Sequence, residues 1–242
     1  MIHWISFFKK LVNEPVAISI VERLNWLIMN NEKETSRVEA FSDGVFAIAI
    51  TLLILEIKVP EPETRLTNSQ LFTSLINLWP SYFAFLLSFT AVLIMWINHH
   101  GFFKYLKTLN PRFLYANGFL LLMVTFIPFP TAVLAKYIDS PAANIASAFY
   151  CGAMVLVSVA YNLLWFTTAY KRRLVKDEIS DALIIKIRNA YWFGFFVYLT
   201  SFIISFFFAI AGLFICISLW IFWIVLDYNS IRKKAVRKSN FL

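Results

Sequence analysis

The stretch RVEAFSDGVFAIAITLLILEIKVP, residues 37–60, joins a polar opening to an apolar run that is long enough to cross a membrane. The polar opening carries Arg37, Glu39, Ser42 and Asp43. A charged side chain at membrane depth costs about 2.5–3.5 kcal/mol even on a lenient insertion scale, so Asp43 needs a polar partner. The stretch therefore predicts a first membrane-spanning helix whose polar end is held by neighbouring helices.

The composition of the whole chain is that of an integral membrane protein. Of its 242 residues, 60% are hydrophobic and 18% aromatic, whereas 15% are charged, and the mean hydropathy is +0.69. Soluble domains are about 45–50% apolar and about 25% charged. A soluble globular fold is therefore excluded.

Further spans are predicted from windows without Asp, Glu, Lys or Arg, which cover residues 66–103, 113–135, 140–170 and 189–226. The last window would be about 57 Å long as one helix, roughly twice a hydrocarbon core of about 30 Å, so it should fold back near Gly212. The predicted fold class is an all-α integral membrane protein with six transmembrane helices per chain. The predicted spans are 38–59, 74–101, 111–136, 142–170, 187–209 and 211–229.

Basic residues predict the orientation of these helices. If the N-terminus is cytoplasmic, 19 of the 22 Lys and Arg residues lie inside, and only Lys58, Arg65 and Lys136 lie outside. The positive-inside rule then places both termini in the cytoplasm. The formal net charge of +8 is a topology signal and not a nucleic-acid footprint, although such a surface can also attract anionic lipids.

Three segments are predicted along the chain. Residues 1–36 form a cytoplasmic N-terminal extension that can hold an amphipathic surface helix, residues 37–229 form the six-helix transmembrane domain, and residues 230–242 form a basic cytoplasmic tail. The connection over residues 171–188 is either a short helix at the cytoplasmic surface or a solvated loop that runs into the fifth span, and both alternatives fit its pattern.

Two prolines interrupt the third predicted span. Pro128 and Pro130 both lack a backbone N–H, so the helix should kink or unwind there. A structural kink and a transporter binding site are both consistent with this break.

The first span has two different faces when it is built at 100° per residue. The residues within about 60° of one line are Gly44, Ile48, Thr51, Leu52 and Leu55. Such a stripe can simply face lipid or another helix, with the Thr51 hydroxyl bonded back to the Ala47 carbonyl. Alternatively, several copies can surround a narrow pore in which apolar rings control wetting and a hydroxyl ring hydrates a cation.

Ser42 and Asp43 lie on another side of this helix, about 120–140° from the stripe. The second span ends in MWINHH, which brings His99 and His100 to the same membrane level as Arg37 and Asp43. A cluster of these groups can brace the first helix, or it can relay protons in a proton-coupled transporter. Neither a metal site nor a set of catalytic residues is predicted, because no third strong ligand and no nucleophile–base pair accompanies them.

Taken together, Arg37, Phe41-Ser42-Asp43, the following GVFAIAITLLILEI and the later Trp96-Ile97-Asn98-His99-His100 closely resemble the single-repeat prokaryotic members of the lysosomal potassium channel family, transmembrane protein 175. The resemblance implies a homotetramer in the cell membrane, with the first helix lining a central pore. It implies potassium as the permeant ion and no cofactor.

The resemblance also implies roles for individual residues. The pore constriction is expected at Ile48, Leu52 and Leu55, and the layer linked to potassium selectivity at Thr51. The polar network that braces the first helix is expected to comprise Arg37, Ser42, Asp43, His99 and His100.

Overall fold

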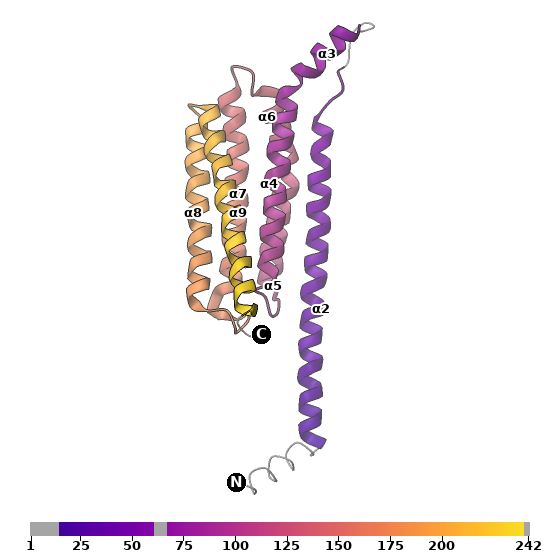
Figure 1. Cartoon of the computed structure of the whole chain (residues 1–242), viewed down its shortest axis with the longest axis vertical. Helices are drawn as coiled ribbons and strands as arrows, with labels where there is room; N and C mark the ends of the chain where they lie inside the picture. Colours follow the sequence, from indigo (N-terminus) through magenta and orange to yellow (C-terminus); the bar gives the residue numbers. More distant parts are fainter. Residues whose placement is uncertain (1–14, 61–66, 240–242) are drawn as a thin grey trace.

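The computed structural model describes residues 15–60 and 67–239. These residues form a bundle of long, roughly aligned helices (Figure 1). The elements in chain order are α2 (Pro15–Leu52), η1 (Leu53–Glu56), α3 (Asn68–Asn77), α4 (Trp79–Phe103), α5 (Pro111–Phe126), α6 (Pro128–Tyr137), α7 (Ala143–Ala169), η2 (Tyr170–Arg172), α8 (Asp181–Ser205) and α9 (Ala209–Ser239). Within the described residues there is no β-strand, so the predicted all-α fold is confirmed.

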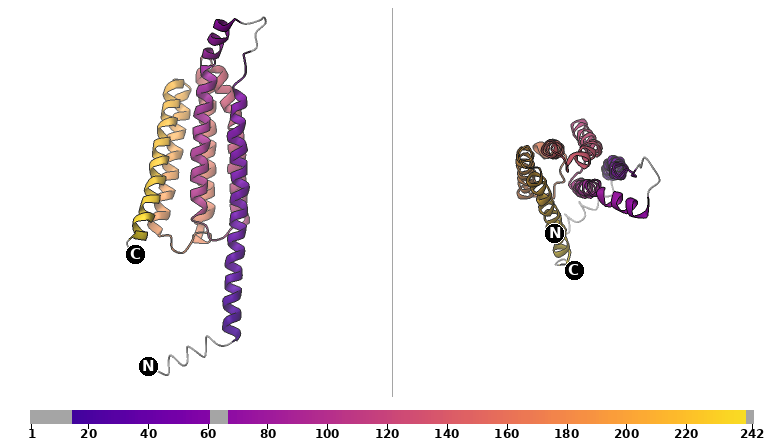
Figure 2. Two further views of the ribbon diagram at one scale, coloured as in Figure 1. Left: turned by 45° about the vertical axis from the view of Figure 1, so that its right-hand side comes forward. Right: turned by 90° about the horizontal axis from the view of Figure 1, so that it is seen from above.

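Four helical stretches are long and apolar enough to cross a membrane: Lys33–Glu56, Trp79–Phe103, Pro111–Tyr137 and Ala143–Arg172. They correspond to the first four predicted spans. Helices α8 and α9 correspond to the fifth and sixth, and they lie alongside α7 (Figures 1 and 2). Their crossing of the membrane stays a prediction, as do the tetramer and the cytoplasmic location of both termini.

The helix that contains the first span begins well before the predicted boundary between extension and membrane domain. Helix α2 runs without interruption from Pro15 to Leu52, and its N-terminal part projects beyond the bundle (Figure 1). Helix α9 likewise continues to Ser239, into the predicted basic tail. Residues 1–14 and 240–242 lie outside the described residues, so the three predicted segments stay predictions.

The second span begins at Trp79, five residues later than predicted. The residues before it form a separate helix, α3, which starts with a capping box: the Thr67 side chain accepts from Gln70 N, and the Gln70 side chain accepts from Thr67 N. Pro80 lies at the start of α4 and has no N–H to continue the ladder from α3. The chain therefore breaks at Leu78, which periodicity alone did not predict.

The predicted break in the third span is confirmed. Helices α5 and α6 meet at Ile127, whose N–H donates to the Val124 carbonyl at 3.2 Å in a tightened turn. The next ladder donors are missing because Pro128 and Pro130 lack an N–H. The buried Thr131 hydroxyl donates to the Ile127 carbonyl at 2.8 Å, which satisfies a backbone group at the kink.

The predicted turn near Gly212 is misplaced. Helix α8 ends at Ser205 and α9 begins at Ala209, so the turn precedes Gly212, which lies within α9. The reason for the glycine is close packing. The Ser201 hydroxyl donates to the Gly212 carbonyl at 2.7 Å, and a Cβ at residue 212 would lie only 1.9 Å from Ser205 Oγ.

A clasp formed by residues 105–107 and 174–176 joins two loops at the end of the bundle where α4 finishes. Leu106 and Val175 form an isolated antiparallel bridge, and Lys107 N donates to the Leu174 carbonyl at 2.9 Å. The Lys107 side chain also bonds to Asp177 at 2.8 Å, which lowers the pKa of that exposed carboxyl. These contacts join the two loops directly, although neither segment is helical.

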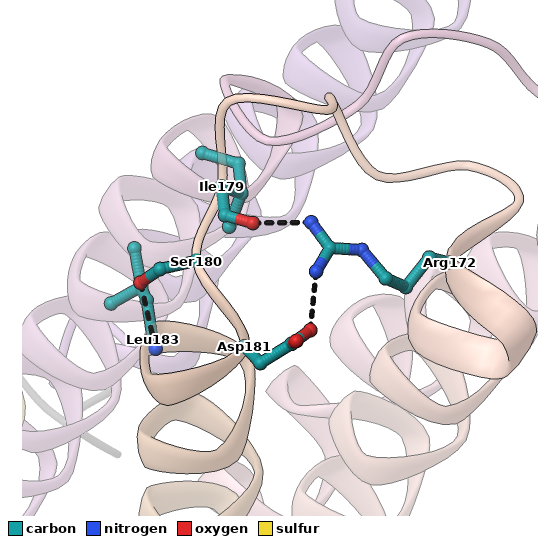
Figure 3. Close-up of polar contacts among 5 residues, drawn as sticks. All are labelled: Arg172, Ile179, Ser180, Asp181 and Leu183. Carbon is teal, nitrogen blue, oxygen red and sulfur yellow. Dashed lines mark hydrogen bonds and ion pairs between the residues drawn. The ribbon is translucent and has the colours of Figure 1, made fainter.

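Contacts of Arg172 and Ser180 hold the start of α8 in place (Figure 3). The Arg172 guanidinium donates to the Ile179 carbonyl and to the Asp181 carboxylate, and the Ser180 hydroxyl caps α8 by accepting from Leu183 N at 3.3 Å. Of the two alternatives for residues 171–188, the structure agrees with the loop that runs into the fifth predicted span, because α8 begins at Asp181 and continues to Ser205.

We expect Gly212→Ala to destabilise the protein by about 1–3 kcal/mol, as overpacking does. The added Cβ would lie 2.9 Å from the Ser201 carbonyl oxygen and 2.9 Å from Ser205 Cα, so the backbones of α8 and α9 must separate. Thermal melting in detergent measures the effect. The matched control is Gly118→Ala on α5, where no atom lies within 4 Å of the new Cβ, and it should not lower the melting temperature.

Candidate functional site

One face of α2 is packed against the bundle. Ser42, Phe46, Ala49 and the following Leu53 of η1 recur at helical spacing and are at most 1% exposed. They face α4 and α5, the main helices with which α2 makes contact. The buried stripe shows that the rotation of α2 about its own axis is fixed by packing.

The opposite face of α2 is bare in the single chain. Ile48 is 60% exposed, Leu52 43% and Leu55 58%, although all three are large apolar side chains in a membrane span. Only 22% of the apolar window of this span is buried, compared with 56% for the span containing α7. Viewed from above, α2 stands at the edge of the bundle (Figure 2). The sequence-predicted stripe is therefore the exposed face.

Thr51 belongs to this bare face, and its hydroxyl is bonded back to its own helix. It donates towards the Ala47 carbonyl at 3.0 Å and the Ile48 carbonyl at 2.9 Å. A hydroxyl has one proton and two lone pairs. Since its proton is directed at the helix backbone, its lone pairs are left for a group in front of the bare face.

A buried amide ties α2 to α4 and α5. Asn117 of α5 donates through Nδ2 to Ser42 Oγ at 3.0 Å, and its Oδ1 lies 2.9 Å from His99 Nε2 of α4. Ser42 in turn donates to the Val38 carbonyl at 2.8 Å. These donors leave Asn117 Oδ1 as the acceptor, so His99 carries its proton on Nε2. Ser42, His99 and Asn117 are all at most 3% exposed.

Aromatic rings enclose the other side of His99. Its ring centroid lies 5.2 Å from that of Phe46 on α2 and 4.9 Å from that of Phe103 on α4. The buried His99 Nδ1 has no hydrogen-bond partner among the described residues. The His99 ring therefore donates one hydrogen bond, to Asn117, and is otherwise packed against the rings of Phe46 and Phe103.

The remaining predicted polar residues do not join this network. Asp43 accepts a hydrogen bond from Trp96 Nε1 at 2.9 Å, and Glu39 lies 2.8 Å from His100 Nδ1. Arg37 is exposed and makes no ion pair with any described residue. The structure thus brings Ser42 and His99 together through Asn117. Asp43 and His100 each make a separate contact between α2 and α4, and Arg37 takes part in none of these contacts.

Three partners were not assigned a role from the sequence: Glu39, Trp96 and Asn117. Asn117 had a usable signal, because it is an amide inside the charge-free window 113–135 and a buried amide needs partners. Trp96 and Glu39 gave weaker signals, since both residue types also occur at membrane boundaries without a specific contact. Among the described residues, no group of three His, Cys, Asp or Glu could hold a metal ion.

The chain is similar to a known family of membrane proteins. The profile of the family described as "Endosomal/lysosomal potassium channel TMEM175" matches residues 37–128, which cover the C-terminal part of α2 and all of α4 and α5. A potassium channel of Chamaesiphon minutus is 47% identical over 72% of this chain and 86% of the relative. A potassium channel of Streptomyces collinus is 45% identical over 55% of this chain and 64% of the relative.

Solved structures give the same result. The crystal structure of a lysosomal potassium-selective channel TMEM175 homolog from Chamaesiphon minutus matches with a TM-score of 0.71 and 43% identity, covering 80% of this chain and 97% of that one. Vertebrate relatives are named endosomal/lysosomal proton channels; the human protein is 30% identical, and the match covers 27% of its length.

The helical bundle, its apolar spans and these relatives define an integral membrane protein of the ion-channel class, and not an enzyme. Within that class, the chain belongs to the TMEM175 family of potassium channels.

We expect Asn117→Leu to lower the free energy of unfolding by about 1–3 kcal/mol, because the buried His99 Nε2–H is left without an acceptor. The Ser42 hydroxyl loses the bond from Asn117 but keeps its own bond to the Val38 carbonyl. Thermal melting of the detergent-solubilised protein measures the loss. In a double-mutant cycle, Ser42→Ala should cost clearly less in the Asn117→Leu background than in the wild type. Strictly additive costs would show that the amide does not couple the helices.

Proposed function

We propose that this protein is a potassium-permeable channel which conducts passively through a central pore, and that four copies surround this pore with their α2 helices. The observation that carries the proposal is the two-sided character of α2. One side is locked to α4 and α5 by burial and by Asn117, while the other side exposes large apolar residues. Relatives named potassium channels support potassium as the permeant ion.

Ile48, Leu52 and Leu55 would form the constriction of this pore. Ile48 and Leu52 are one turn apart, so copies around an axis would form apolar rings separated by roughly 6 Å. Narrow apolar rings resist wetting, and ions cross them only when the passage widens or the ion loses water. Gly44, whose bare face has no atom within 4 Å of a Cβ position, would leave room at the entrance.

Thr51 would provide the polar layer between these rings. Its proton is bonded to backbone carbonyls, so its oxygen lone pairs face the bare side. Lone pairs attract a partly dehydrated cation and repel an anion. A ring of such hydroxyls gives a cation site without any formal charge.

The remaining polar residues would position α2 rather than conduct. Asn117, Ser42 and His99 would fix its rotation, and Asp43 with Trp96 and Glu39 with His100 would fix its tilt against α4. Arg37 and the other basic residues at this end would lie in the cytoplasm, next to anionic lipid headgroups. We place the protein in the cell membrane of a prokaryote, with both termini inside.

A proton-coupled transporter is less consistent with these contacts. A relay would need Asp43 and His99 in one hydrogen-bonded chain, whereas Asp43 bonds to an indole and His99 to an amide. An indole N–H cannot pass a proton onward without leaving its ring charged.

The proposal is tested by flux measurements on the reconstituted full chain. Liposomes loaded with potassium are diluted into sodium or potassium buffer, and a proton-sensitive dye with a protonophore reports charge movement. Potassium flux that needs no pH gradient is expected. Flux that appears only with a pH gradient would replace the channel by the transporter, and flux without potassium dependence would indicate proton permeation.

We expect Ile48→Asn to raise potassium flux about tenfold, because a polar ring wets the constriction, and such a change corresponds to a barrier lower by about 1.4 kcal/mol. The liposome assay measures it. The matched control is Ile145→Asn on α7, which is exposed to 61% where Ile48 is exposed to 60%. If both variants change flux equally, Ile48 does not line the pore.

We expect Thr51→Ala to lower the ratio of potassium to sodium flux about threefold or more, because it removes one hydroxyl oxygen per copy from the proposed cation site. Bi-ionic potentials across a planar bilayer give this ratio. Thr125→Ala is the control, since Thr125 on α5 is also exposed and its hydroxyl is also bonded back to a helix carbonyl, that of Leu122. An unchanged ratio in Thr51→Ala contradicts the assignment.

A further inference from the structure

A cavity lies between α4, α7, α8 and α9, behind the face of α4 that holds α2. About 450 Å³ of the cavity is empty when its open mouth is included. The residues that line it are Ala91, Ile94, Met95, Asn98, Val157, Ser158, Tyr161, Tyr191, Tyr198, Trp220 and Trp223. A space of this size takes a small ring or a short chain.

The cavity wall is made of aromatic and aliphatic side chains with two polar ones, Asn98 and Ser158, and it carries no charged side chain. One of its tyrosine hydroxyls is already bonded, since Tyr161 donates to the Met95 carbonyl at 2.6 Å. A charged ligand would lose its hydration here without a counter-charge. The wall therefore favours a neutral and largely apolar guest.

Two polar groups in the wall remain available. Asn98 donates through Nδ2 to the Ile94 carbonyl at 2.9 Å, and its Oδ1 bonds to no described residue. Within the described part of the chain, the Ser158 hydroxyl also has no hydrogen-bond partner, although it is not fully enclosed. Polar atoms at the edge of an apolar cavity fix the orientation of a ligand that has one polar end.

The cavity is connected to α2 through a continuous series of ring contacts. Centroid distances along the series are 5.7 Å for Trp223–Tyr191, 6.2 Å for Tyr191–Trp165, 5.6 Å for Trp165–Phe102, 6.1 Å for Phe102–Phe113, 5.8 Å for Phe113–Phe103, 4.9 Å for Phe103–His99 and 5.2 Å for His99–Phe46. Helix α4 also presents Met95 and Asn98 to the cavity but Trp96 and His99 to α2.

We propose that this cavity is a binding site for a small neutral amphiphile, an apolar ring or short chain with one hydroxyl, and that its occupancy shifts α4 against α2 and so changes potassium flux. The first part of the proposal, ligand binding, depends only on the cavity. The regulatory half rests on the proposed function, because it needs α2 to line the pore. Close-packed helices shift as units when a ligand fills space between them, so a guest at α4 biases the position of the helix on its other side.

Binding is tested with 4-bromobenzyl alcohol, whose bromine quenches tryptophan fluorescence at contact. Two tryptophans, Trp220 and Trp223, lie in the cavity wall. In the purified full chain we expect saturable quenching in addition to the linear part caused by partition into detergent or lipid. Quenching that is linear throughout would overturn the site.

Two neighbouring valines on α7 give a matched pair of variants. Val157 lines the cavity and is 4% exposed, whereas Val159 lies outside it and is 38% exposed. We expect Val157→Phe to weaken saturable binding about tenfold or more by filling the space, and Val159→Phe to leave it unchanged. Equal binding in the two variants would place the probe elsewhere.

The polar end of the ligand is tested by Ser158→Ala. Loss of one hydrogen bond should weaken 4-bromobenzyl alcohol about threefold to tenfold and leave 4-bromotoluene, which has no hydroxyl, unaffected. Equal loss of both probes, or of neither, would contradict the assignment of Ser158 as the hydroxyl partner.

The regulatory half is read from flux at saturating probe. A change of about twofold or more in the wild type and in Val159→Phe, absent from Val157→Phe, supports coupling to the pore. Saturable binding with unchanged flux would show that the cavity binds the probe but is not coupled to the pore. If the wild type carries no potassium flux at all, the proposed function fails, while the fluorescence result still decides whether the cavity binds.

Discussion

The buried amide of Asn117 is the contact on which the arrangement of α2 depends. An amide inside a membrane bundle has to satisfy two donors and an acceptor where water is absent, and leaving one of them unmade costs about 1–3 kcal/mol. Asn117 meets this demand for one N–H, which donates to Ser42 of α2, and for its oxygen, which accepts from His99 of α4. A shift of α2 by one residue would turn Ser42 by about 100° and break the contact. The polar end of the helix therefore sets which apolar residues stay bare.

The other helices keep this contact in place. Behind it, Ser88 of α4 lies 2.6 Å from the Thr131 hydroxyl of α6 and donates to Tyr150 of α7 at 3.3 Å, all within the buried core. At the end of the bundle, the clasp of residues 105–107 and 174–176 joins the loop after α4 to the loop after α7. The two helices that hold α2 are thus themselves tied to the rest of the chain, so α2 rests on a stiff support.

The sequence predicted much of this fold because membrane helices leave strong signals. Charge-free windows located α4, α5, α6 and α7, and the prolines located the kink at Ile127. The helix break at Leu78 and the position of the turn before Gly212 were not predicted, since both depend on local backbone contacts: a lost proline N–H in one case and close helix packing in the other. The continuation of α2 back to Pro15 was missed because polar residues end a hydrophobic window without ending a helix.

For the site, periodicity correctly separated the bare stripe of α2 from its buried side, as Ile48 and Ser42 illustrate. It could not give the partners of the polar residues. Whether Asp43 meets His99 or Trp96 depends on the rotation of α4, which a single helical wheel does not contain. The role of Asn117 follows from three helices meeting at one point, and only the tertiary structure shows that.

The length of α2 has a mechanical consequence. Its 38 residues make a rod about 57 Å long, whereas a hydrocarbon core is about 30 Å thick. Almost half of the rod thus extends past the bilayer as one uninterrupted helix, with no hinge between the protruding segment and the bare face. The protruding segment and the proposed pore-lining residues Ile48 and Thr51 therefore belong to one continuous helix, so a tilt applied to the extension acts directly on the proposed pore wall.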